Sequence, residues 1–163
     1  MAMNDLRAVI EKHAHADCVA PPQSADWKTR RDLFTSIYRT DSNAGYTFPD
    51  RFKTLERELE RCYCAGAFVA CIMLSKALAE AVDAQFGNNA TDRANFWTSI
   101  SGQVSQVDKN WLANLRNTWA HAAKDPKYQL AQYANYVNKQ SEIENDAVTA
   151  MRIAFRIGCE YAK

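Results

Sequence analysis

Apolar residues recur every three or four positions through most of the chain, which is the periodicity of helices with one buried face. No segment alternates apolar and polar residues as a half-buried strand does. The pattern therefore predicts an all-α protein. The strongest predicted helices cover residues 4–16, 24–40, 49–86, 108–124 and 142–162.

Weaker helical patterns lie between these segments. Residues 91–107 favour a short helix, and residues 127–139 form either a helix or an ordered loop. Gly66 marks a bend or a tight contact inside 49–86, and Asp108 is the predicted N-cap of the helix that follows it. Short connections between amphipathic helices favour an up-down helical bundle of four to five core helices.

The segment from Phe68 to Val82 is apolar over most of its circumference. A helix of this kind packs against neighbours on several sides, so we expect it at the centre of the bundle. The chain has 163 residues, of which 47% are hydrophobic. This length and composition suit one compact domain with a sizeable core.

The formal net charge is only +1, which excludes a global basic field of the kind that drives nonspecific binding to nucleic acid. Any RNA contact must therefore be local. Lys28, Arg30 and Arg31 give the second predicted helix a basic character, and Lys124 adds a cation at the end of 108–124. These four side chains are candidate RNA contacts, and a solvated helix face is the alternative interpretation.

The longest apolar run, residues 65–74, is too short to cross a bilayer, and the first residues lack the apolar core of a signal peptide. We therefore expect a cytoplasmic protein without a membrane partner. The five cysteines include Cys62 and Cys64, but no second pair follows at zinc-ligand spacing. Reduced thiols are the expected state, and we expect neither a metal site nor a cofactor.

Trp111, Leu115 and Trp119 recur every four residues in the helix predicted over 108–124. At about 100° per residue they fall within one apolar stripe, which should face the core. A regulator with an apolar small-ligand pocket lined by Trp97, Trp111, Trp119 and the tyrosines is one functional alternative. Aromatic stripes at helical spacing more often belong to a core.

Three polar side chains accompany this stripe without being required by it. Asn117 and His121 lie four residues apart, away from the tryptophans, and the long side chain of Arg116 can swing toward them. A guanidinium binds phosphate oxygens through a planar fork, and an imidazole titrates near neutral pH. The combination favours phosphate chemistry, although each residue taken alone is common on a solvated helix surface.

The motif Arg116-Asn117-x-x-x-His121 resembles the hallmark of the HEPN superfamily, the higher-eukaryote and prokaryote nucleotide-binding domains. Residues 58–70 and 74–81 look like the paired helices that precede the motif in such proteins. The resemblance covers residues 49–163 as the helical bundle. Residues 1–48 then form an N-terminal helical extension, packed with the bundle as one compact domain.

The resemblance implies a homodimer in which two motif-bearing helices build a shared cleft, and active members are metal-independent endoribonucleases. His121 is then the catalytic acid or base, Arg116 stabilises the phosphate, and Asn117 orders the site. Glu80 is the candidate acid that orients Arg116. A toxin-like or defence-related nuclease with an inhibitory or companion protein is one prediction. The alternative is a noncatalytic HEPN-like module that binds a nucleotide or a protein partner.

Overall fold

The computed structural model describes residues 24–41, 50–120 and 138–162, and in these ranges it contains helices and no strand. The helices are α2 (Ser24–Asp41), α3 (Asp50–Cys64), α4 (Phe68–Ala84), α5 (Ala90–Ser99), α6 (Gln106–Ala120) and α8 (Gln140–Tyr161). The all-α prediction is confirmed. The helix predicted over 4–16 and the segment 127–137 lie outside the described residues.

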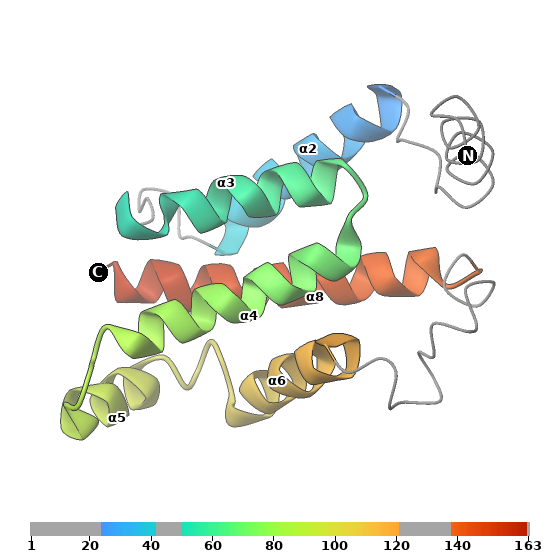
Figure 1. The fold of residues 1–163 in the computed structure, drawn as a ribbon. Helices are drawn as coiled ribbons and strands as arrows, with labels where there is room; N and C mark the ends of the chain where they lie inside the picture. The colour runs from blue at the N-terminus through green and yellow to red at the C-terminus, as the bar shows by residue number, and fades with distance from the viewer. Residues whose placement is uncertain (1–23, 42–49, 121–137, 163) are drawn as a thin grey trace, which may run out of the picture.

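The helices α4 and α8 lie side by side through the middle of the bundle, as Figure 1 shows. In that view α2 and α3 cover one side, α5 and α6 cover the other, and α3 and α6 run against the direction of α2, α4 and α8. The central position of α4 follows from its composition, since apolar residues occupy most of its circumference. Its buried residues are Phe68, Cys71, Ile72, Ser75, Leu78, Ala79 and Val82.

Gly66 lies between two separate helices and not at a bend within a single helix. The helix α3 ends at Cys64 and α4 begins at Phe68, with Gly66 between them at a φ of 76°. A side chain there would also meet Arg30, whose Nη1 lies 3.1 Å from the position of a Cβ atom. Both of the roles expected for this glycine therefore occur together, a change of chain direction and a close contact.

The helix α2 contributes to the same core as the rest of the bundle. Phe34 and Ile37 are buried in it, and Phe34 and Tyr38 both meet the ring of Phe155 edge to face at 5.4 Å between centroids. Such contacts stabilise beyond the area they bury. The described part of the predicted extension is thus packed with the bundle.

The N-cap of α6 lies three residues earlier in the chain than predicted. Ser105 precedes the helix, and its Oγ accepts a hydrogen bond from the backbone N–H of Asp108 at 3.1 Å. The Asp108 carboxylate in turn accepts from the backbone N–H of Ser105 at 2.8 Å and from its hydroxyl at 2.7 Å. Ser105 is therefore the N-cap and Asp108 the third helical residue, which forms a reciprocal capping box. The prediction of Asp108 as N-cap was wrong by three positions.

Four of the cysteines lie in the described ranges, and all four are free thiols: Cys62, Cys64, Cys71 and Cys159. Burial raises the pKa of Cys62, Cys64 and Cys71, which disfavours the thiolate. Within the described residues no group of three His, Cys, Asp or Glu side chains could hold a metal ion. None of the described helices is both long and apolar enough to cross a membrane.

Candidate functional site

The helix α6 carries two of the three motif residues. Its buried line runs through Leu112 and Leu115, while Trp111 and Trp119 flank that line and are half-buried. The predicted stripe of Trp111, Leu115 and Trp119 is therefore displaced, because only Leu115 of the three is buried. The displacement does not alter the predicted position of Asn117, which lies on the exposed side of the helix.

Arg116 and Asn117 contact each other on this side of α6. Nη1 of Arg116 donates a hydrogen bond to Oδ1 of Asn117 at 2.9 Å. A guanidinium has five N–H donors, so this bond orients the group and leaves most of its donors for other partners. No carboxylate of the described residues lies within 4.0 Å of Arg116, whose cation is therefore held by a neutral amide.

His121 and Lys124 follow the last described residue of α6, Ala120, and lie outside the described residues. Their predicted roles in catalysis and RNA contact stay predictions.

Glu80, the candidate orienting acid, forms an ion pair within its own helix. Its carboxylate lies 3.5 Å from Nζ of Lys76, one turn earlier on α4. The hydrogen bond of Arg116 goes to Asn117 instead. Orientation of Arg116 by Glu80 stays a prediction that these contacts do not support.

The three cations predicted on α2 differ in their surroundings. Lys28 is exposed, and Arg31 has 65% of its side chain exposed with Glu60 at 3.5 Å. Arg30 is held inside the bundle, with Nε 3.2 Å from Glu144 and the guanidinium 5.0 Å from the ring centre of Phe68. Lys28 and Arg31 therefore remain available to a ligand, whereas Arg30 ties α2 to α8 and α4.

Glu144 also accepts a hydrogen bond from the Tyr63 hydroxyl at 3.3 Å. Burial, the negative charge of Glu144 and that hydrogen bond all raise the pKa of Tyr63. Tyr63 therefore stays protonated and acts as a donor. Together with Arg30 it makes Glu144 a polar anchor between α2, α3 and α8.

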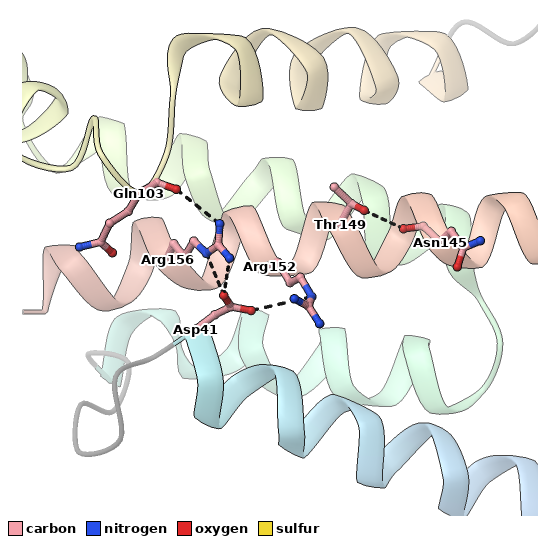
Figure 2. Close-up of polar contacts among 6 residues, drawn as sticks. All are labelled: Asp41, Gln103, Asn145, Thr149, Arg152 and Arg156. Atoms are coloured by element: carbon pink, nitrogen blue, oxygen red, sulfur yellow. Dashed lines mark hydrogen bonds and ion pairs between the residues drawn. The ribbon is translucent and has the colours of Figure 1, made fainter.

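A second arginine cluster joins the end of α2 to α8 (Figure 2). Asp41 has only 3% of its side chain exposed, and its Oδ1 lies 2.8 Å from Nε and 2.7 Å from Nη2 of Arg156. Its Oδ2 lies 4.0 Å from Nε of Arg152 and accepts no hydrogen bond from the described residues. Arg156 also approaches the carbonyl oxygen of Gln103 at 3.4 Å. The cluster therefore fastens α2, α8 and the turn before α6.

Sequence reasoning missed this cluster. Arg152 and Arg156 share a face of α8 at helical spacing, which was visible in the sequence, but their acidic partner lies more than a hundred residues away. Asp41 lies just beyond the helix predicted over 24–40 and is the last residue of α2. The pairing of distant charges is a property of the packed fold and leaves no local signal.

A small cleft opens between α4, α5 and α6, with a volume of about 220 Å³. Its mouth carries charged groups, Lys76, Glu80 and Asp83 from α4 and Lys109 from α6. Trp97 lies beside them and donates from Nε1 to Asp83 at 3.0 Å. Of the residues that line this cleft, only Glu80 and Trp97 had been singled out as functional candidates from the sequence.

We found no match to this chain among family models, curated proteins or solved structures. The likeness to the HEPN superfamily therefore rests on the motif and the helices that precede it. Function has to be argued from the chemistry of the described side chains.

Proposed function

We propose that this protein is a metal-independent endoribonuclease whose active site combines Arg116, Asn117 and His121 at the interface of a homodimer. One observation carries the proposal. The Arg116 guanidinium lies beside Asn117 on α6 and is oriented by a neutral amide. It therefore keeps its full charge and most of its donors, which is what a group that stabilises a phosphate needs.

The chemistry requires only side chains and the ribose of the substrate. An imidazole titrates near neutral pH, at about 6.5 in model peptides, so His121 can accept the proton of the 2′-hydroxyl, and the 2′-oxygen then attacks phosphorus. The bond from phosphorus to the 5′-oxygen of the next nucleotide breaks, that oxygen takes up a proton, and a 2′,3′-cyclic phosphate remains at the end of the upstream fragment. Arg116 stabilises the charge that develops on the phosphate oxygens, and RNA is the substrate because DNA lacks the attacking hydroxyl.

A dimer supplies what one copy of the motif lacks. The reaction needs one group to remove a proton and another to deliver one, whereas each chain offers a single imidazole in the motif. Two motif-bearing helices that meet across a twofold axis provide both. The biological setting that fits such an enzyme is a toxin-like or defence-related cytoplasmic nuclease restrained by a companion protein.

A noncatalytic binding module is the second candidate, and the charges of the surface favour it. Eight of the described cations lie within 4.0 Å of a carboxylate, which reduces the basic surface that could hold RNA. The paired cations are Arg30, Arg31, Lys53, Arg61, Lys76, Arg93, Arg152 and Arg156. On this alternative, Arg116 and Asn117 serve recognition of a nucleotide or a protein partner.

Cleavage of a mixed RNA pool in EDTA by the purified full chain separates the two candidates. The nuclease proposal predicts fragments that end in cyclic phosphate, made by a dimer of the wild type and absent for His121→Ala and Arg116→Ala. Arg61→Ala is the matched control, because Arg61 is a 71% exposed arginine on α3 that pairs with Glu58. Intact RNA after incubation with a folded wild-type dimer contradicts the nuclease and favours the binding module.

A further inference from the structure

The cleft between α4, α5 and α6 joins an apolar floor to a charged mouth. Ala79, Leu112 and Ile157 supply the floor, and all three are buried. The mouth carries a cation, Lys109 from α6, and an acidic side chain, Glu80 from α4. Small-molecule sites commonly combine an apolar surface with a few convergent polar groups, and this cleft has both parts.

Lys109 is the cation of the mouth that lacks an acidic partner. Its Nζ lies 4.3 Å from the centre of the Trp97 ring, and no described carboxylate lies within 4.0 Å of it. The contact with the ring holds the ammonium in place without neutralising it. A ligand carboxylate can therefore bind Lys109 without first breaking an ion pair.

Glu80 is the acidic group most easily released to a ligand. Its contact with Lys76 is 3.5 Å long and 52% of its side chain is exposed, so little free energy holds that pair together. Asp83 is more fully engaged, because it accepts from Trp97 at 3.0 Å and lies 3.5 Å from Nε of Arg93. Of these two carboxylates, Glu80 is therefore the one that a cationic ligand group binds at the lower cost.

We propose that this cleft binds an apolar α-amino acid with a branched aliphatic side chain. The ligand carboxylate binds Lys109, its ammonium binds Glu80, and its side chain covers Ala79, Leu112 and Ile157. A zwitterion satisfies both signs of charge. A simple carboxylate leaves Glu80 with only its long contact to Lys76, and a simple amine leaves Lys109 without an acidic partner.

The size of the cleft is consistent with such a ligand. Its volume of about 220 Å³ lies just below the usual range of small-ligand pockets, about 300–1,000 Å³, and so suits a ligand as small as an amino acid. A ligand with about nine non-hydrogen atoms binds such an open site with a dissociation constant on the order of 1 mM. That affinity suits a ligand present at high concentration.

This proposal is independent of the nuclease. Lys109 precedes Arg116 by seven residues on α6, which places the cleft roughly 10 Å along the helix axis from the proposed catalytic arginine. The test below reads binding and involves no RNA. Its outcome therefore leaves the nuclease proposal unaffected.

The test is a titration of the ¹⁵N-labelled full chain with L-leucine, followed by the indole N–H resonance of Trp97, whose Nε1 donates to Asp83 beside the cleft. We expect saturable shifts at Trp97 and at the amides of α4 and α6 that line the cleft. Three analogues each remove one recognised group. They are 4-methylpentanoate, 3-methylbutylamine and glycine, and each should bind at least about tenfold more weakly.

Protein variants give the reciprocal test. Lys109→Gln and Glu80→Gln should each weaken L-leucine at least about tenfold, whereas Lys53→Gln, which alters a remote lysine on α3, should leave binding unchanged. Absence of shifts at about 20 mM L-leucine overturns the proposal. Shifts of equal size with sodium chloride or with all three analogues also overturn it, because they report ionic strength or nonspecific contact only. Unaltered affinity in Glu80→Gln overturns recognition of the zwitterion.

Discussion

The protein holds two arginine sites that differ in what neutralises the cation. Two nitrogens of Arg156, on α8, lie 2.7 and 2.8 Å from the buried carboxylate of Asp41 at the end of α2. On α6, Arg116 makes its only hydrogen bond among the described residues with the amide of Asn117, at 2.9 Å. The first arginine has its charge compensated inside the fold, whereas the second keeps its charge for a partner. An arginine paired with a carboxylate therefore stabilises the fold, whereas an arginine bonded to a neutral amide can still bind an anionic ligand.

The largest expected effect comes from removing the compensated arginine. Arg156→Ala leaves Asp41 buried with only Arg152 nearby, at 4.0 Å. We expect a loss of about 2–3 kcal/mol in the free energy of unfolding. This loss is smaller than that for a fully buried pair, because 37% of the Arg156 side chain is exposed. Urea denaturation measures this loss. Arg152→Ala is the matched control and should cost less than about 1 kcal/mol. Equal losses in the two variants contradict the difference drawn between them.

A somewhat smaller effect is expected at the junction of α3 and α4. Gly66→Ala places a side chain at a positive φ and against Arg30, and we expect a loss of about 1–2 kcal/mol in the free energy of unfolding. Gly102→Ala is the control, because nothing lies within 4 Å of its Cβ position. Thermal denaturation compares the two. A Gly66→Ala variant as stable as Gly102→Ala shows that the junction tolerates another backbone geometry.

The capping box before α6 sharpens the comparison, because it anchors the helix that carries Arg116. Ser105→Ala removes both hydrogen bonds of the Ser105 hydroxyl and keeps the one from its backbone N–H to Asp108, and we expect a loss of about 1 kcal/mol in the free energy of unfolding. Urea denaturation at neutral pH measures it. Unchanged stability would mean that water replaces the cap without cost.

The same box predicts a pH dependence. Hydrogen bonds from Ser105 hold the pKa of Asp108 below its usual value, because they favour the carboxylate. The folded state thus gains stability above the unfolded pKa of about 3.9, and this gain is lost as the pH falls through the lower folded pKa. Asp108→Asn should flatten the stability profile in that acidic window. A variant with the acid slope of the wild type places the titrating group elsewhere.

The smallest effect on stability is expected at the uncompensated arginine. Arg116 has no carboxylate partner among the described residues and lies beside an exposed amide, so Arg116→Ala should change the free energy of unfolding by less than about 0.5 kcal/mol. Urea denaturation beside Arg156→Ala makes the comparison direct. A loss as large as that of Arg156→Ala shows that Arg116 serves the fold.

Local patterns predicted much of the architecture. The apolar circumference of Phe68–Val82 indicated the central helix, and α8 was expected over 142–162 and is observed over Gln140–Tyr161. The cap of α6 was misplaced because serine and aspartate three residues apart are both good N-caps, and only the direction of their hydrogen bonds tells them apart.

The sites were less predictable than the helices. Periodicity placed Asn117 on a polar face, and the length of the Arg116 side chain indicated that it could swing toward that face, since both depend on one helix alone. It could not reveal that Arg30 is held by Glu144, or that Arg156 meets Asp41, because each pair joins segments that come together only when the bundle packs. The same holds for the cleft, whose residues come from four helices.

The most direct test of the difference between the two arginine sites is the rate of RNA cleavage in EDTA. Arg116→Ala and Arg152→Ala are each compared with the wild type, under conditions where all three proteins are folded. Arg116 should lower the barrier through its contact with the phosphate, so its removal should slow cleavage by about 10²–10³-fold. Arg152→Ala should stay within about twofold of the wild type, because Arg152 lies beside Asp41 in the other cluster. Cleavage by Arg116→Ala at the wild-type rate, or a wild type that leaves RNA intact, contradicts a catalytic role for the uncompensated arginine.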